Sequence, residues 1–129
     1  MEKIGIHGIY IENRCLFMVE KEGWDILPGG KRKIGELDNM CLEREVKEEL
    51  SGSRITVGDY YGSFFGITPN SNQPLISKNY FIYFMDNIGE PSAEISRRKF
   101  VTSKDNPNLH LTEISRKVFD SLIKNDLID

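Results

Sequence analysis

Residues 29–52 read GGKRKIGELDNMCLEREVKEELSG, a glycine-rich start followed by an acidic, helix-forming end. At about 100° per residue, Glu45, Glu48 and Glu49 share one face of a helix, because positions i, i+3 and i+4 are neighbours there. Each same-face pair of carboxylates destabilises a helix by about 0.2–0.5 kcal/mol, and the nearby Lys47 lies on the opposite side. A bound divalent cation would offset this repulsion. The stretch therefore predicts a metal-binding helix face beside a sharp glycine turn.

The acidic face belongs to a helix that is expected to run to about Ser51. Asp38 or Asn39 can cap its N-terminus, since a short polar side chain can accept a hydrogen bond from a free backbone N–H group. The apolar stripe of this helix, at positions i, i+4 and i+8, consists of Leu42, Val46 and Leu50. The carboxylates lie beside this stripe, so we expect them at the edge of the buried surface, close to solvent.

The rest of the chain predicts strands before and after this helix and a second helix at the end. Residues 4–11 and 15–19 are rich in β-branched and aromatic residues and flank a polar turn, which indicates a β-hairpin. Further strands are expected at residues 24–27, 55–68, 78–85 and 99–101, and an amphipathic helix at residues 112–124. This order favours an α/β (α+β) fold, a mixed β-sheet sandwiched between helices. A chain of 129 residues without repeats or linkers is expected to form one domain, residues 1–129.

Composition and charge exclude several classes of protein. The net charge of −3 argues against a general nucleic-acid binder, which needs a basic surface, but it is compatible with a small phosphorylated ligand bound through a metal. Cys15 and Cys41 are far apart and belong to no CxxC motif, so neither a zinc site nor a redox site is indicated. The first residues do not resemble a signal peptide, and the longest apolar run, residues 80–85, is too short to span a bilayer. We therefore expect a cytoplasmic protein with no membrane segment.

Seven positions of the opening stretch fit one spacing pattern, which is Gly, five residues, Glu, seven residues, and then Arg-Glu-apolar-any-Glu-Glu. The residues that fit it are Gly30, Glu36, Arg44, Glu45, Val46, Glu48 and Glu49. The stretch resembles the Nudix box, the signature of the Nudix (MutT-like) hydrolase superfamily. The resemblance implies the Nudix fold and a metal-dependent pyrophosphohydrolase that cleaves a diphosphate linkage in a nucleoside diphosphate linked to another moiety. Where the family has Gly and an apolar residue, this chain has Ser51 and Gly52, so we expect a helix one residue longer or a remodelled turn.

The resemblance also implies a ligand set for Mg²⁺ or Mn²⁺, hard cations that prefer oxygen ligands. The implied metal ligands are Glu45, Glu48, Glu49, the backbone carbonyl of Gly29 and, from the loop before the helix, Glu36. Two roles are open for Glu36, binding the metal through water or pairing with Arg44. The planar guanidinium of Arg44 is suited to holding a carboxylate with two hydrogen bonds, which makes it a candidate catalytic-site residue.

The general base is left open between two glutamates. Glu45 is one candidate, from among the metal-facing carboxylates. Glu94 is the other, because it precedes a predicted strand in a segment that resembles the loop from which some Nudix enzymes draw their base. Glu90 is a weaker rival. The expected substrate is a small nucleotide with a diphosphate linkage, of the nucleoside triphosphate or nucleotide-sugar type.

Other polar and aromatic residues have two interpretations each. His7 lies alone in the first predicted strand and is interpreted as structural rather than as a base or ligand. The run Lys31–Lys33 could bind phosphate oxygens or form a solvated loop. Four strand aromatics could stack on a base, although core packing is the commoner role: Phe64, Phe65, Tyr80 and Tyr83.

An alternative to the enzyme is a non-catalytic Nudix-fold module that binds and senses a nucleotide. The atypical Ser51-Gly52 end motivates it, while three carboxylates on one helix face argue for catalysis. A solvated acidic helix is the third reading. The sequence is compatible with a homodimer and does not establish one.

Overall fold

A computed structural model describes residues 3–129 of the chain. Its strands are β1 (Lys3–Ile9), β2 (Ile11–Glu12), β3 (Cys15–Lys21), β4 (Trp24–Ile26), β5 (Gly29–Lys31), β6 (Arg54–Ile67), β7 (Pro74–Asp86) and β8 (Ile95–Val101). Its helices are α1 (Asp38–Glu49), the short 3₁₀ helix η1 (Ser103–Asn108) and α2 (Glu113–Lys124). Within this described part, none of the helices has the length and hydropathy needed to cross a membrane.

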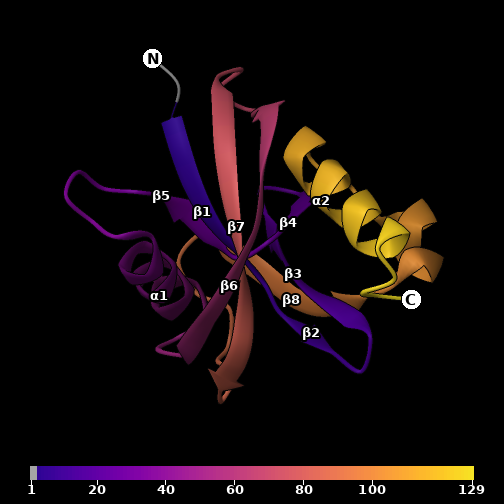
Figure 1. The fold of residues 1–129 in the computed structure, drawn as a ribbon, viewed down its shortest axis with the longest axis horizontal. Helices are drawn as coiled ribbons and strands as arrows, with labels where there is room; N and C mark the ends of the chain where they lie inside the picture. The colour runs from indigo at the N-terminus through magenta and orange to yellow at the C-terminus, as the bar shows by residue number, and fades with distance from the viewer. Residues whose placement is uncertain (1–2) are drawn as a thin grey trace.

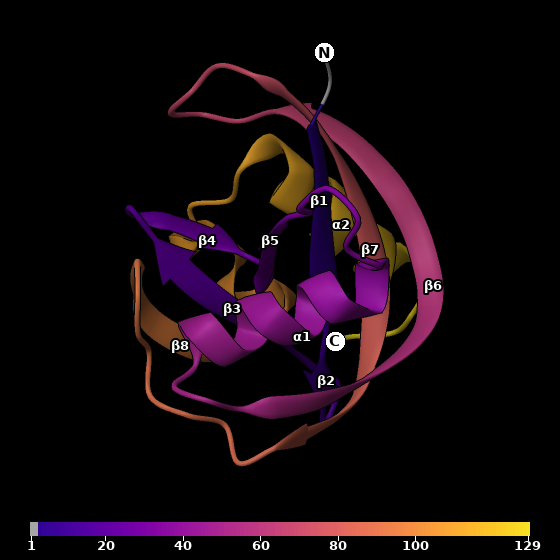
Figure 2. The same cartoon turned by 90° about the vertical axis from the view of Figure 1, so that its left-hand side faces the viewer.

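The strands form two four-stranded sheets. In the first, the order is β5-β1-β7-β6, with β1 parallel to β7 and the other pairs antiparallel. In the second, β3 lies in the middle, with β8 along one edge and β2 and β4 along the other. The helices α1 and α2 lie on opposite sides of β1 and β7 (Figure 1), and the view turned by 90° shows α1 in front of these strands and α2 behind them (Figure 2). The predicted α/β (α+β) class with helices on both sides is confirmed.

The predicted hairpin between residues 4–11 and 15–19 is wrong in its first strand. β1 pairs with β5 and β7 of the first sheet, and the short β2 pairs with β3 in its place. The polar turn does form, with Asn13 and Arg14 both at positive φ, 52° and 62°. The chain changes sheets at Tyr10, between β1 and β2. A run of β-branched residues indicates a strand but does not specify its partner, which here lies far away in the sequence.

The expected glycine turn is also different, because Gly29 and Gly30 belong to the strand β5. Gly29 lies opposite His7 on β1 and has φ 140°, a backbone conformation that favours glycine. A Cβ atom on Gly29 would lie 2.1 Å from the carbonyl oxygen of Ile6. Glycine is therefore required here for β5 to approach β1.

The helix α1 packs as its apolar pattern predicts, but its first turn differs. The three stripe residues Leu42, Val46 and Leu50 are fully buried. Leu37, not Asp38 or Asn39, is the N-cap residue, and no side chain caps this end. The carboxylate of Asp38 instead accepts hydrogen bonds or ion pairs from three side chains: Arg32 and Lys78, each at 2.5 Å, and the hydroxyl of Tyr80. The predicted cap is thus wrong, since tertiary partners on β7 and the preceding loop take up this carboxylate.

Of the two outcomes expected at Ser51, a longer helix or a remodelled turn, the longer helix is wrong, because α1 ends at Glu49. Ser51 itself adopts the left-handed conformation, with φ 45°, and Gly52 follows with φ 85°. The N–H group of Gly52 donates to the carbonyl of Lys47 at 2.9 Å, which closes the helix end. The Ser51 hydroxyl donates to the Glu90 carbonyl at 2.7 Å. The serine thus occupies the conformation that a glycine usually takes, and its side chain ties the turn to a neighbouring loop.

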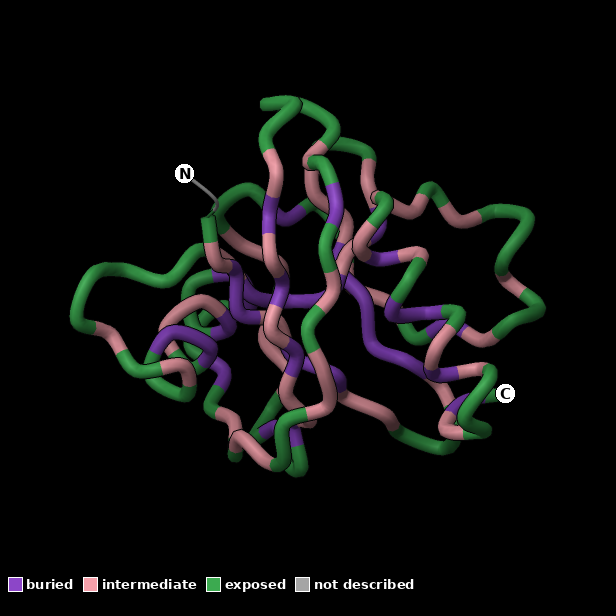
Figure 3. Tube along the Cα trace, turned by 45° about the horizontal axis from the view of Figure 1, so that its top comes forward, coloured by how far each residue is buried: buried purple, intermediate pink, exposed green. Residues whose placement is uncertain are grey.

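Two apolar clusters hold the layers together, one beneath each α-helix. The cluster beneath α1 joins this helix to both sheets and includes Ile6, Phe17, Leu42, Val46 and Ile82. The cluster beneath α2 includes Ile9, Leu16, Val118, Phe119 and Leu122. Buried backbone runs through the middle of the molecule, and exposed loops surround it (Figure 3). The predicted final helix is confirmed, with Thr112 as its N-cap residue.

Candidate functional site

A cleft of about 590 Å³ opens between the two sheets. Its walls come from β1, β5 and β7 of the first sheet, β3 and β4 of the second, α1, and the start of α2, together with residues 67–71 at the β6–β7 turn and the loop before β8. Five of the residues predicted to form a site line it: Gly29, Glu45, Glu48, Glu49 and Glu94. Glu36 and Arg44 are not part of the lining, but Arg44 contacts it through Glu45.

Glu49 is the most buried of the three helix carboxylates, with 6% of the residue exposed. Its Oε1 atom accepts a hydrogen bond from the backbone N–H group of Gly29 at 3.0 Å. Burial is the main cause that raises the pKa of Glu49, to about 8, and the negative charge of Glu45 adds to it. Without a metal, Glu49 therefore carries a proton over much of the neutral range.

Glu45 occupies a space that exists because residue 30 is glycine. A Cβ atom on Gly30 would lie 2.5–2.7 Å from the three atoms of the Glu45 carboxyl group. The same carboxylate accepts a hydrogen bond from Nη1 of Arg44 at 2.8 Å through Oε1. The two glycines of β5 thus have separate roles, since Gly29 permits the approach of β5 to β1 and Gly30 leaves room for the carboxylate of Glu45.

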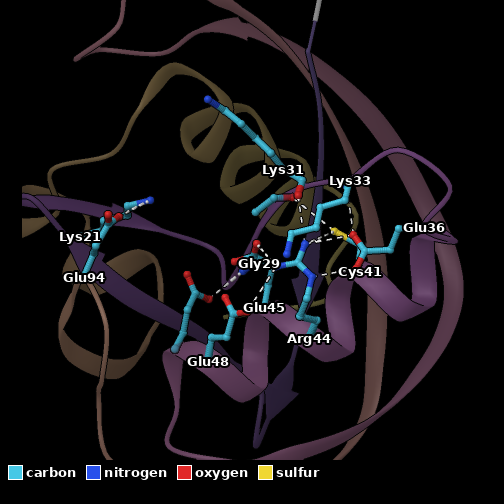
Figure 4. Close-up of polar contacts among 12 residues, drawn as sticks. Lys21, Gly29, Lys31, Lys33, Glu36, Cys41, Arg44, Glu45, Glu48 and Glu94 are labelled. Atoms are coloured by element: carbon cyan, nitrogen blue, oxygen red, sulfur yellow. Dashed lines mark hydrogen bonds and ion pairs between the residues drawn. The ribbon is translucent and has the colours of Figure 1, made fainter.

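Arg44 lies between Glu36 and Glu45 (Figure 4). Its Nε donates to Oε2 of Glu36 at 2.7 Å and its Nη2 to Oε1 at 3.0 Å, a bidentate pair. Glu36 also accepts from the backbone N–H of Lys33 at 3.0 Å. The Arg44 guanidinium is the main cause that lowers the pKa of Glu36, to about 2. Of the two roles open for Glu36, the structure shows the pairing with Arg44.

Residues 3–129 contain no set of three acidic, histidine or cysteine side chains already drawn together as a metal site. Glu45 is engaged by Arg44 and Glu49 by Gly29, while the Glu48 side chain is 53% exposed and its Oε1 lies 3.5 Å from Nη1 of Arg44. The residues nevertheless fit a hard divalent cation, because three carboxylates line one wall of the cleft and the carboxylate of Glu45 lies against the backbone of Gly30, next to Gly29. A cation would have to compete with the present partners of Glu45 and Glu49.

Glu94 reaches the cleft from the loop before β8, where its Oε2 pairs with Nζ of Lys21 at 2.9 Å. This hydrogen bond lowers the pKa of Glu94, so the side chain is a carboxylate at neutral pH. Glu90, the weaker rival, is not among the residues that line the cleft, and its carboxylate contacts Arg98 at 3.3 Å. Position thus favours Glu94 over Glu90.

Sequence patterns missed several residues of the cleft. Lys21 on β3 and Trp24 on β4 line it, and the Trp24 ring stacks on His110 with centroids 3.8 Å apart.

Of the residues with two interpretations, Lys31 lines the cleft, unlike the other two residues of the basic run. His7 is also in the lining, and burial lowers its pKa to about 4, so its imidazole is neutral. The four strand aromatics considered for base stacking lie outside this lining.

A family comparison agrees with this arrangement. The sequence model of the NUDIX domain matches residues 4–122. The chain belongs to the Nudix family. This Nudix protein is a hydrolase that acts on phosphoric anhydride bonds. Nudix hydrolases generally use divalent metal ions and act on small nucleotide substrates.

Solved structures with the same fold include two MutT proteins and one bifunctional enzyme. The MutT NUDIX hydrolase from Burkholderia pseudomallei has a TM-score of 0.81 and 16% identity, over 93% of this chain and 97% of that chain. The MutT protein from Methanosarcina mazei Go1 has a TM-score of 0.81 and 17% identity, over 97% and 95% of the two chains. A bifunctional NMN adenylyltransferase/ADP ribose pyrophosphatase from Francisella tularensis has a TM-score of 0.74 and 16% identity, over 96% and 41%. No match was found among curated proteins. At these identities the structural likeness shows the shared fold, and the predicted Nudix fold is confirmed.

Proposed function

We propose that this Nudix hydrolase is a Mg²⁺- or Mn²⁺-dependent pyrophosphohydrolase that cleaves a diphosphate linkage in a nucleoside triphosphate or a nucleotide-sugar type substrate. The observation that carries the proposal is that Glu45, Glu48 and Glu49 together line one wall of the cleft, beside Gly29 and Gly30. A diphosphate is anionic, so a wall of carboxylates can bind it through a divalent cation and not directly. The basic residues Lys21 and Lys31 in the same cleft supply positive charge for the remaining phosphate oxygens.

The cation would be held by the carboxylates of Glu45, Glu48 and Glu49 and by the backbone carbonyl of Gly29. When bound, it would neutralise negative charge that develops on the diphosphate oxygens during attack by water. Glu36 takes its second role in this proposal, since it fixes the guanidinium of Arg44. Arg44 in turn orients the carboxylate of Glu45.

The attacking water must give up a proton, and Glu45 and Glu94 are the two candidate acceptors in the cleft. The pair between Glu94 and Lys21 supports Glu94, because it keeps the carboxylate ionised and on the cleft wall. Glu94→Gln and Glu45→Gln separate the two candidates. Loss of the base should abolish the acidic limb of the pH–rate profile for kcat, whereas loss of a metal ligand should weaken the dependence on metal concentration.

The experiment that tests the proposed function is a screen of nucleoside triphosphates and nucleotide sugars with Mg²⁺ or Mn²⁺, with product identification. Release of phosphate, pyrophosphate or a nucleoside monophosphate is expected. Glu48→Gln and Glu49→Gln should each lower kcat by at least about 100-fold, by analogy with the loss of other preorganised electrostatic groups. Glu43→Gln is the matched control, because Glu43 is exposed on the same helix and lies outside the cleft.

Full activity of both glutamine variants would contradict the assigned site. Tight nucleotide binding without turnover under any divalent cation would favour the non-catalytic module. A homodimer is a separate question that the elution volume of the purified protein answers.

A further inference from the structure

His7 lies in the cleft without a role in the proposed function. On β1 it is opposite Asn79 of β7 on one side and opposite Gly29 of β5 on the other. Neighbouring strands are about 4.8 Å apart. The backbone of His7 is therefore one strand away from Gly29, which binds Glu49, and β7 follows on the other side of it.

The His7 ring is held in one orientation. Its Nδ1 atom lies 2.7 Å from Oγ of Ser77. The ring lies over Gly5, where a Cβ atom would be 2.9 Å from Cε1 of the imidazole. Within residues 3–129, Nε2 has no hydrogen-bond partner, and the half-buried His7 lines the cleft. Nε2 is thus the nitrogen available to a ligand.

The hydrogen bonds behind His7 determine which nitrogen carries the proton. Nδ2 of Asn79 donates to the carbonyl oxygens of Ser77 at 3.0 Å and Gly62 at 3.4 Å, which fixes the amide orientation because carbonyls can only accept. The same Nδ2 lies 3.2 Å from Oγ of Ser77. The fully buried Ser77 hydroxyl must then give its own proton to Nδ1 of His7, its one available acceptor among the described residues. This leaves the ring proton on Nε2, directed to the cleft.

One acceptor of this polar chain has no partner among residues 3–129, and both Ser77 and Asn79 line the cleft. Oδ1 of Asn79 is buried without a hydrogen-bond partner in the described part of the chain. A buried unpaired acceptor costs free energy that an apolar side chain at this fully buried position would not. Asn79 thus has a structural role through Nδ2, which bonds two backbone carbonyls, and an acceptor, Oδ1, that no described residue uses.

We propose that His7 reads the nucleobase, with its Nε2–H group donating a hydrogen bond to an acceptor atom of the base, and that Ser77 and Asn79 are positioning residues that keep the proton on Nε2. The inference rests on the proposed function, because it takes the ligand to be a nucleotide whose diphosphate lies at the α1 carboxylates. The base then extends from Gly29 on β5 to His7 on β1, with Ser77 and Asn79 of β7 also in the cleft lining. Lys21 and Lys31 are available for the phosphates, and an imidazole whose Nδ1 accepts from Ser77 is a neutral donor at Nε2, which suits the uncharged base.

The first test determines the tautomer of His7 by NMR on protein labelled with ¹⁵N-histidine. The chain has two histidines, so His110→Gln assigns both imidazoles. Parent protein at pH 7 should show Nε2 protonated and Nδ1 unprotonated for His7. Ser77→Ala should shift His7 towards a mixture of tautomers, because the donor to Nδ1 is gone. A proton on Nδ1 in the parent protein would overturn the proposal.

The second test measures affinity for AMP, GMP, CMP and UMP by calorimetry, since these probes carry a base but no diphosphate. Parent protein should prefer one base, and His7→Leu should reduce that preference about tenfold. His7→Gln keeps an N–H donor and should retain part of the preference, and unfolding midpoints of both variants exclude misfolding as the cause. Equal base preference in parent and His7→Leu, or no binding of any of the four, would overturn the proposal. Absence of turnover on nucleotides would overturn the proposed function instead, and the binding data would still decide the role of His7.

Discussion

Glu49 is an ionisable side chain in an unfavourable place, since it is buried beside another carboxylate and binds a backbone N–H group. Burial raises its pKa from 4.5 in the unfolded chain to about 8 in the folded one. Between these two values the folded state binds the proton more tightly than the unfolded state does. In the metal-free protein, the contribution of Glu49 to the free energy of unfolding should therefore fall by about 3–5 kcal/mol as the pH rises from 4.5 to 8.

Urea unfolding of the metal-free protein at several pH values measures this effect. Glu49→Gln should remove the fall that Glu49 causes and should be more stable than the parent at pH 8, because an amide needs no proton. Glu43→Gln, on the exposed side of the same helix, should reproduce the parent curve. A stability difference between the parent and Glu49→Gln that is the same at pH 5 and at pH 8 would show that Glu49 is ionised when buried, and the comparison cancels the opposite contribution of His7, whose pKa is lowered.

Replacing each of the two glycines of β5 by alanine should have a different effect, a loss of stability at Gly29 and a loss of activity at Gly30. Gly29→Ala should destabilise the protein by more than about 3 kcal/mol, because φ is 140° and the new Cβ would lie 2.1 Å from a backbone oxygen of Ile6. Gly30→Ala meets only the flexible end of Glu45, so stability should change by less than about 1 kcal/mol. Its kcat should fall at least tenfold, since the displaced carboxylate leaves its place beside Arg44.

Unfolding curves and steady-state kinetics on the two variants separate these outcomes. A stable, inactive Gly30→Ala protein would support the role of that glycine in the cleft. Unchanged kcat in Gly30→Ala would contradict it.

At the scale of elements, α1 is tied to the first sheet through Asp38. Although burial opposes it, hydrogen bonds from Lys78, Tyr80 and Arg32 hold the pKa of Asp38 at about 2. Asp38→Asn should therefore lower the free energy of unfolding by about 1–2 kcal/mol at pH 7. A lowered pKa stabilises the folded state above the unfolded value of 3.8, so the difference should shrink as the pH falls from 4 towards 2.

Urea unfolding at pH 7 and at pH 3 tests this, with Asn39→Ala as the control. Asn39 is exposed and is not the N-cap residue, so its replacement should change stability by less than about 0.5 kcal/mol. A larger loss in Asn39→Ala than in Asp38→Asn would restore the sequence-based cap.

The local patterns of the chain predicted its helices and its long strands well. The apolar spacing of Leu42, Val46 and Leu50 sufficed to place α1, because a stripe of this kind has one way to become buried. The pairing partners of the strands could not be predicted in the same way, since β1 pairs with β7 some 70 residues away and local sequence does not encode that choice. Ser51 shows the same limit on a smaller scale, because the hydrogen bond from its hydroxyl to the Glu90 carbonyl, made in the turn where it adopts φ 45°, belongs to tertiary structure.

The candidate site divides in the same way. The spacing of Glu45, Glu48 and Glu49 follows from helix geometry, and the structure places all three on the cleft wall. The contacts of Lys21 with Glu94 and of His7 with Ser77 join segments that are distant in the sequence, so no sequence motif predicts them. The side chains that share one helix face can thus be predicted from sequence, whereas the residues of the opposite wall of the cleft can be identified only once the fold is known.

At the scale of the whole molecule, a divalent cation would bind where α1 meets β5, and both elements also line the cleft. A ligand that binds the folded state alone stabilises it by RT ln(1 + [L]/Kd), about 2.7 kcal/mol at 100 times Kd. Mg²⁺ or Mn²⁺ should therefore raise the melting temperature of the parent protein and leave Glu48→Gln much less affected. Glu43→Gln, which keeps all three cleft carboxylates, should respond as the parent does.

The same titration should depend on pH, because the cation and the proton compete for Glu49. At pH 6 the buried carboxyl is largely protonated, with its pKa at about 8, and the cation must displace that proton. At pH 8 the displacement costs less, so a given Mg²⁺ concentration should raise the melting temperature more at pH 8 than at pH 6. A shift that is equal at both pH values would show that Glu49 does not bind the cation, whereas no shift at either would leave Glu45, Glu48 and Glu49 as a solvated acidic face and would contradict the metal site itself.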